Sequence, residues 1–125
     1  MELVTAVNLI RAGVPGAQTP QHWADLGAGS GLFTQALASL LPVGSSVQAI
    51  DQHKSSLDSI EWSDAHITLI RTQADFSEIE FSELKDGFIL ANALHYIENK
   101  QAQLSRLKKH LTPTGRIIIV EYETD

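Results

Sequence analysis

The sequence predicts an α/β fold in which helices cover both faces of a mainly parallel five-stranded sheet. Short apolar runs alternate along the chain with segments whose apolar residues recur at helical spacing. Two of the runs, residues 88–91 (FILA) and 117–120 (IIIV), are apolar throughout, which is typical of strands buried on both faces. Parallel neighbours need crossover connections, and the intervening helical segments can supply them.

The elements can be justified in order from the apolar spacing and from the glycines and prolines that interrupt it. An opening helix stops at Gly13 and Pro15, and the helix after the first strand stops at Pro42. The final helix, expected to include Leu111, is separated from the last strand by residues 112–115 (TPTG). The predicted strands are residues 22–26, 46–51, 66–71, 88–91 and 116–122. The predicted helices are the opening helix, with Leu3, Val7 and Ile10 on one face, and residues 33–41, 53–60 and 98–111.

Composition limits the classes of function. The 125 residues include 9 Lys plus Arg and 15 Asp plus Glu, and 43% are hydrophobic, so we expect a single globular domain over residues 1–125. No apolar stretch is long enough to span a membrane, and the start of the chain lacks the features of a signal peptide, so we expect a cytoplasmic protein. The net charge of −6 argues against nucleic-acid binding and favours a small or neutral partner.

Several features are expected to have no chemical role. The chain has no cysteine, and its histidines lack the spacing of a helical zinc site, so we assign no metal. Most of a basic run over residues 100–116, which includes Arg106, is interpreted as a solvated helix face.

A glycine-rich segment follows the first predicted strand. Residues 25–31 (DLGAGSG) place three glycines at alternate positions, which allows a ligand to approach the backbone where it turns into a helix. A dinucleotide fingerprint would need glycine or alanine where the chain has Leu32, and a P-loop would need a lysine that is absent, so both alternatives are disfavoured. The remaining alternative is a tight turn without a ligand.

Two acidic residues follow the next two strands. Asp51 ends the second strand, where a carboxylate can accept hydrogen bonds from both ribose hydroxyls, although it could instead cap the helix that begins near His53. Asp75 could accept from the amine of adenine while Phe76 packs on the ring. Alternatively, Asp75 opens a solvated acidic loop over residues 75–86.

Residues 23–31 (WADLGAGSG) resemble the first motif of class I S-adenosylmethionine-dependent methyltransferases. Residues 47–51 (VQAID), 89–96 (ILANALHY) and 111–116 (LTPTGR) resemble later segments of the family in the same order. The similarity covers nearly the whole chain from residue 23 onward. It implies a Rossmann-like methyltransferase fold, arranged as a three-layer sandwich, with S-adenosyl-L-methionine as the cofactor.

The resemblance also implies roles for individual residues. The expected cofactor-binding residues are Asp25, Gly27, Ala28 and Gly29 for the methionine part, Asp51 for the ribose, Gln52, Asp75 and Phe76 for the adenine, and Asn92 beneath the sulfonium. His95 and Tyr96 follow on the substrate side. His95 could act as a base or could simply shape the pocket, so no catalytic residue is assigned.

The family fold ordinarily has two more strands after the fifth, which are lacking here. We therefore expect a domain that is short at its C-terminus, whether it is part of a longer chain, a natural minimal protein or a half completed by another chain. An apolar fifth strand at a sheet border predicts a possible homodimer through that edge. The leading hypothesis is a methyltransferase with a small-molecule acceptor, and the alternative is a noncatalytic cofactor-binding or interaction module.

Overall fold

The structure is a computed structural model that describes residues 1–94 and 97–121. Its elements follow one another as α1 (Leu3–Ile10), a 3-10 turn (Arg11–Gly13), β1 (His22–Leu26), α2 (Leu32–Leu40), β2 (Ser46–Asp51), α3 (Lys54–Asp58), β3 (Thr68–Gln73), β4 (Lys85–Ala91), α4 (Lys100–Lys108) and β5 (Leu111–Val120). Strands and helices alternate except between β3 and β4, where the structure shows neither.

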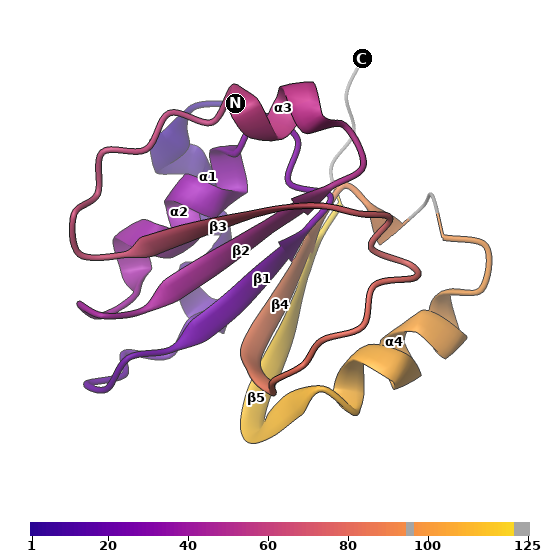
Figure 1. Cartoon of the computed structure of the whole chain (residues 1–125). Coiled ribbons are helices and arrows are strands. Elements are labelled where there is room, and N and C mark those ends of the chain that lie inside the picture. The colour runs from indigo at the N-terminus through magenta and orange to yellow at the C-terminus, as the bar shows by residue number, and fades with distance from the viewer. Residues whose placement is uncertain (95–96, 122–125) are drawn as a thin grey trace.

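The strands form one sheet in the order β3-β2-β1-β4-β5, and every neighbouring pair is parallel (Figure 1). The predicted α/β fold with a parallel five-stranded sheet is therefore confirmed. The chain moves outward from β1 through β2 to β3, then returns to the other side of β1 as β4. In sheets of this kind, ligands bind beyond the carboxyl ends of the strands at the point where the strand order reverses. That point lies between β1 and β4.

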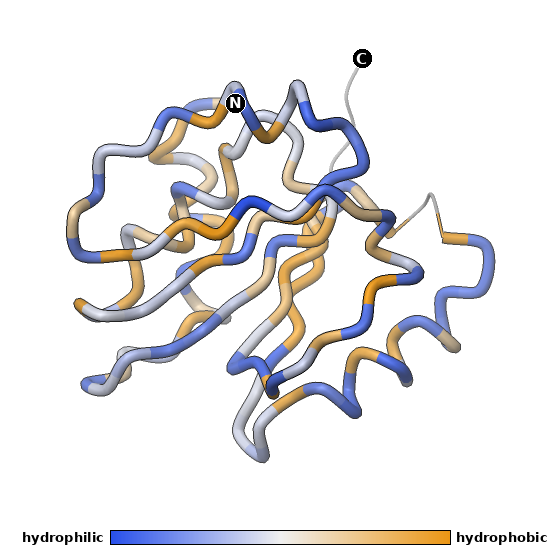
Figure 2. Tube along the Cα trace, viewed as in Figure 1, coloured by the Kyte–Doolittle hydropathy of each residue, from blue (hydrophilic) through white to orange (hydrophobic). Residues whose placement is uncertain are grey.

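The side chains of successive strand residues point to opposite faces of the sheet and build two cores. On one face, Trp23 and Val47 pack with α1 and α2, and both are fully buried. On the other face, Ala24 and Phe88 pack in a cluster that includes Leu107 of α4. Helices thus cover the sheet from both sides, as the three-layer expectation required (Figure 1). Hydrophilic residues predominate along α4 in Figure 2, whereas the second halves of β4 and β5 are hydrophobic.

Several predicted boundaries are wrong. The third helix spans only Lys54–Asp58, and β3 begins two residues later than expected. β4 begins at Lys85 rather than residue 88, because its first residues pair through backbone atoms and carry no apolar signal: the Lys85 N–H donates to the carbonyl of His110. None of these changes moves the carboxyl ends of β1, β2 or β4, so the expected location of the site is unaffected.

The last helix and the last strand also differ from the prediction. Leu111 belongs to β5 and not to α4, which ends at Lys108. Leu111 pairs with Lys85 and Arg116 pairs with Gly87, so residues 112–115 form an irregularity within the strand instead of a turn before it. β5 ends at Val120, and Tyr122 lies outside the described residues.

β5 lies at one end of the sheet, as expected, and β3 lies at the other. Pairing of two copies through the β5 edge stays a prediction. No helix in the described part of the chain is long and apolar enough to cross a membrane.

Candidate functional site

The glycine-rich segment forms the connection from β1 to α2. Gly27, Gly29 and Gly31 all have positive φ values, of +80°, +56° and +92°. A Cβ atom at Gly31 would lie 2.8 Å from the side chain of Ile60, so this glycine is required for packing. A Cβ atom at Gly29 would have no atom of the described residues within 4 Å, apart from those of Gly29 and its two chain neighbours. The backbone at Gly29 is therefore open to a ligand.

The larger cavity at this end of the sheet has a volume of about 370 Å³. It lies beyond the carboxyl ends of β1, β2, β3 and β4, the location expected for a ligand in this topology. Its lining residues are Gly27, Asp51, Gln52, His53, Ala74, Asp75, Phe76, Ala91, Asn92 and Ala93. Six of the nine cofactor-binding residues predicted from the sequence are among them.

A smaller cavity of about 230 Å³ contains the rest of the predicted set. It is lined by Asp25, Gly27, Ala28, Gly29, Ser30, Leu32, Phe33 and Ala91. The two cavities share Gly27 and Ala91, so they meet at the glycine turn. All nine predicted residues therefore line one or both of these cavities, at one edge of the sheet.

Asp25 is a buried carboxylic acid in the smaller cavity, and its side chain is only partly satisfied. The hydroxyl of Thr34 donates to Oδ2 over 2.7 Å, whereas Oδ1 has no hydrogen-bond partner among the described residues. Burial raises the pKa of Asp25 to about 7; the Thr34 hydrogen bond opposes this shift, and the charge of Asp51 adds to it. A buried oxygen without a partner is costly, and a cationic donor would satisfy it.

Asp51 links the end of β2 to the glycine turn. Its Oδ2 accepts from the N–H of Gly29 over 2.9 Å, and its Oδ1 accepts from the N–H of His53 over 2.8 Å. The ring Nδ1 of His53 lies 3.3 Å from the same Oδ1. The N-cap of α3 is His53 itself, so Asp51 binds the N–H just before the helix and does not cap it. A carboxylate has about four lone-pair positions, and it can therefore accept further hydrogen bonds from a ligand.

Asp75 and Phe76 lie on the exposed connection after β3. Ser77 donates to Oδ1 of Asp75 from its hydroxyl, over 2.7 Å, and from its backbone N–H, over 2.9 Å. These two bonds, the hydroxyl bond first, lower the pKa of Asp75, so its carboxylate is charged at neutral pH. The ring of Phe76 lies 3.4 Å from the position that a Cβ of Gly27 would take. The connection therefore packs directly against the glycine turn.

The remaining predicted residues complete the larger cavity. Gln52 is exposed, and its carbonyl accepts from the side chain of Gln73 over 3.3 Å. Asn92 follows β4 with a φ of +56°, the one positive value at a non-glycine residue in the described part. Strained backbone of this kind is concentrated at functional sites. His95 and Tyr96 lie outside the described residues.

Sequence reasoning did not assign several residues that help to form the site. Thr34 holds Asp25, and its only signal was a polar side chain at a position where the helix is otherwise apolar. His53, Ala74, Ala91 and Ala93 also line the larger cavity. The alanines gave no chemical signal, because their contribution is the space that a small side chain leaves.

Comparison with known proteins identifies the family. Residues 24–117 match the model of a methyltransferase domain. Over 99 residues the chain is 32% identical to a ubiquinone biosynthesis O-methyltransferase of Rickettsia typhi, an alignment that covers 76% of this chain and 38% of that protein. The chain thus spans well under half the length of this curated relative.

Two solved structures share the fold. An S-adenosylmethionine-dependent methyltransferase from Clostridium acetobutylicum matches with a TM-score of 0.75 at 16% identity, over 95% of this chain and 50% of the other. An amino pentose methyltransferase from Micromonospora echinaspora, solved with S-adenosylmethionine bound, matches with a TM-score of 0.68 at 16% identity, over 97% of this chain and 50% of the other. Because the family model matches most of the chain, this protein belongs to the methyltransferase-domain family, and its resemblance to class I S-adenosylmethionine-dependent methyltransferases is confirmed.

Proposed function

We propose that this chain binds S-adenosylmethionine across the two cavities and transfers its methyl group to a small-molecule acceptor. The observation that carries the proposal is the order of polar groups along the site. A buried carboxylate oxygen of Asp25 that has no hydrogen-bond partner in the described part of the chain lies on one side of the glycine turn, and the carboxylates of Asp51 and Asp75 lie on the other. This order matches a ligand that has an ammonium group at one end and a ribosyl adenine at the other.

Each part of the cofactor has a chemically suitable partner. The ammonium group of the methionine part would satisfy Oδ1 of Asp25, directly or through water. The ribose hydroxyls would donate to Asp51, which the Gly29 and His53 N–H groups hold in place. Asp75 would accept from the adenine amine, with Phe76 and Gln52 beside the ring. The residues of both cavities therefore fit S-adenosylmethionine.

When bound, this cofactor supplies a methyl group activated by a positively charged sulfur. The contribution of the chain is then mainly to align cofactor and acceptor and to provide a suitable electrostatic setting. We place Asn92, with its constrained backbone at the end of β4, next to the reacting group. The substrate-side roles of His95 and Tyr96 stay predictions. The O-methyltransferase relative supports an oxygen acceptor in particular.

Calorimetric titration with S-adenosylmethionine, S-adenosylhomocysteine and a nicotinamide dinucleotide tests the cofactor. We expect the first two to bind and the third not to bind. Methyl transfer is then measured across a panel of phenols, catechols, amines and amino sugars, with Asp51→Ala as the control for cofactor-dependent turnover. Binding of the nicotinamide dinucleotide alone would overturn the proposal. Binding of S-adenosylmethionine without transfer to any acceptor would favour the noncatalytic module.

A further inference from the structure

The connection between β3 and β4 carries three residues of the larger cavity, Ala74, Asp75 and Phe76, but contains no helix or strand. Its first part is folded around Asp75: the N–H groups of Glu78 and Ile79 donate to the Asp75 carbonyl over 3.0 and 3.1 Å. Ser77 adds its two bonds to the Asp75 carboxylate. These bonds shape the turn locally, but they do not attach it to the rest of the molecule.

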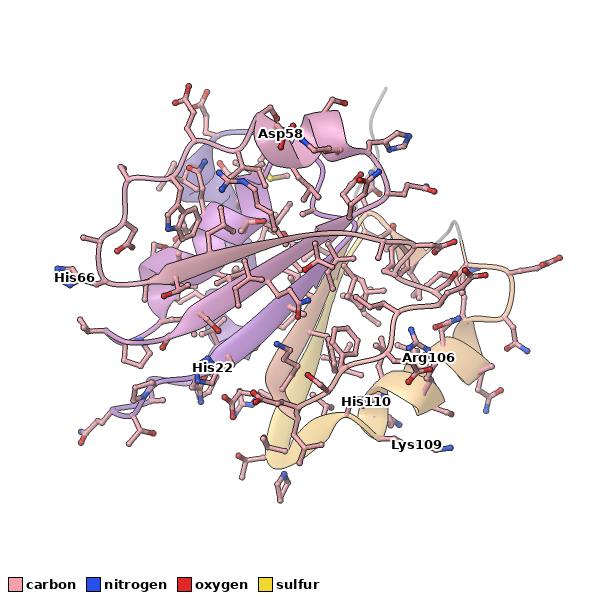
Figure 3. The ribbon with its side chains drawn as sticks, viewed as in Figure 1. His22, Asp58, His66, Arg106, Lys109 and His110 are labelled. Atoms are coloured by element: carbon pink, nitrogen blue, oxygen red, sulfur yellow. The ribbon has the colours of Figure 1, made fainter. Side chains whose placement is uncertain are left out.

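Phe76 and Ile79 pack against the core of this sheet face, and two side chains of α4 add a polar attachment through the backbone of the turn. Arg106 donates from Nη2 to the carbonyl of Phe76 over 2.7 Å and from Nη1 to the carbonyl of Ile79. Gln103 donates from Nε2 to the carbonyl of Ser77 over 2.9 Å, and its Oε1 accepts from Nε of Arg106 over 3.0 Å. Arg106 extends from α4 into the region of this connection in Figure 3. Gln103 and Arg106 thus bind three backbone carbonyls of the turn, those of residues 76, 77 and 79.

The helix that carries these side chains is itself firmly placed. Leu107 of α4 is 1% exposed and belongs to the core of this sheet face. The side chain of Asn99 caps the helix by accepting from the N–H of Ala102 over 3.1 Å. Arg106 and Gln103 therefore connect the turn at Asp75 to a helix packed on the sheet. Since a guanidinium has a rigid fork of donors, it can hold two carbonyls at once, which a lysine cannot do in the same way.

We infer that Arg106 is a positioning residue for cofactor selectivity: by holding residues 76–79 against α4, it keeps Asp75 and Phe76 at the adenine end of the larger cavity. The inference rests on the proposed function. It sets Arg106 apart from the part of the basic run that forms a solvated face, because the side chain is half-buried and its donors are engaged. The role is indirect, since Arg106 is not among the residues that line the cavity.

A purely structural role would lower thermal stability without changing which base the site prefers. The test therefore compares two ligands that differ at the edge of the purine assigned to Asp75. S-adenosylhomocysteine carries the exocyclic amine, and S-inosylhomocysteine has a carbonyl oxygen in its place and a proton on the adjacent ring nitrogen N1. We expect the wild-type chain to bind the first about tenfold more tightly than the second. The measured quantity is this ratio of dissociation constants.

Four variants sharpen the test. Arg106→Met should reduce the ratio from about tenfold to about threefold or less, close to the ratio of Asp75→Asn. The ratio of Arg106→Lys should lie between those of Arg106→Met and the wild-type chain. Lys109→Met is the matched control, because it removes one positive charge from the same end of α4, while Lys109 is exposed and points away from the connection (Figure 3). The control should keep the wild-type ratio within about twofold. Circular dichroism verifies that each variant is folded.

The outcomes separate this inference from the proposed function. If the wild-type chain binds neither ligand, the proposed function fails and the inference fails with it. If it binds both equally, or if folded Arg106→Met keeps the wild-type ratio, cofactor binding stands and the inference is overturned. Should Arg106→Met not fold, Gln103→Leu takes its place: it removes the bond to the Ser77 carbonyl and the bond from Nε of Arg106, and it leaves the two Arg106 bonds to the carbonyls of Phe76 and Ile79. An unchanged ratio in folded Gln103→Leu and Arg106→Lys would then overturn the inference.

Discussion

At the glycine turn, all but one of the residues that line the smaller cavity come from a nine-residue stretch, 25–33, and Ala91 is the exception. The adenine end of the larger cavity is assembled differently. Asp75 and Phe76 lie on an exposed connection whose carbonyl at Phe76 is bound by Arg106, 30 residues farther along the chain. One end is therefore a local strand-turn-helix unit, and the other depends on docking to a distant helix.

From this difference we expect the local end to supply most of the affinity for the cofactor, and the docked end to supply selectivity for the base. The local end contains a buried carboxylate and backbone that passes close to the ligand, so substitutions there should remove most of the affinity. The docked end places an exposed carboxylate in contact with water, so substitutions there should have smaller effects that depend on the base. Four substitutions, from the largest expected effect to the smallest, test this contrast.

Gly29→Val should abolish detectable binding of S-adenosylmethionine, a loss of more than about a hundredfold. A branched side chain is strained at a φ of +56°, and it would project into space that is free of protein atoms and that we assign to the ligand. Calorimetry with circular dichroism measures this effect. Gly16→Val is the control, because Gly16 lacks a positive φ and has open space around it. A folded Gly29→Val chain with native affinity would remove the turn from the site.

Asp51→Ala, at the junction of the two ends, should weaken S-adenosylmethionine binding by about ten- to a hundredfold. The carboxylate is expected to bind the ribose, and it also accepts the Gly29 N–H that shapes the turn. Asp58→Ala on α3 removes a comparable charge from an exposed position, labelled in Figure 3, and should leave affinity unchanged. A change of less than twofold in folded Asp51→Ala would contradict the ribose assignment.

Asp25 should make cofactor affinity depend on pH. Because burial raises its pKa to about 7, the carboxyl is protonated in the unliganded protein below this pH, and pairing with an ammonium group requires the proton to leave. Affinity should therefore rise with pH, by up to about tenfold per unit, and level off above pH 7. Binding titrations between about pH 5.5 and 8 measure how steeply affinity rises with pH. In Asp25→Asn we expect this dependence to be absent.

The raised pKa of Asp25 also predicts that the free energy of unfolding depends on pH. The folded chain keeps a proton that the unfolded chain releases above its ordinary pKa of 3.8, so stability should fall as pH rises from about 4 to 7 and then stay constant. Asp25→Asn should lack this contribution in urea unfolding experiments. An identical pH profile in wild type and Asp25→Asn would show that another group titrates.

Asp75→Asn should have the smallest effect, a loss of about three- to tenfold in affinity for S-adenosylhomocysteine. The carboxylate is exposed, so water competes for its hydrogen bonds, and the ring contact with Phe76 is retained. Parallel titrations of wild type and variant give the ratio. A loss as large as that of Asp51→Ala would contradict the contrast between the two ends.

The sequence by itself determined the alternation of strands and helices, the glycine turn and the acids that end β2 and follow β3. These features are local: burial on both faces requires continuous apolar runs, and close backbone approach requires glycine at Gly29. Parallel strands also bring their carboxyl ends to one edge, so residues after different strands could be assigned to one site before any contact was known.

Only the tertiary structure decided which polar groups have hydrogen-bond partners. Thr34 binds one oxygen of Asp25, and the other has no partner among residues 1–94 and 97–121; this arrangement depends on how α2 packs on β1. The early start of β4 and the irregularity at residues 112–115 depend on backbone pairing, which apolar spacing does not report. The contacts of Arg106 depend on bringing α4 beside residues 76–79. A charged residue in a basic run looks solvated in sequence, because its burial and partners arise only from packing between segments far apart in the chain.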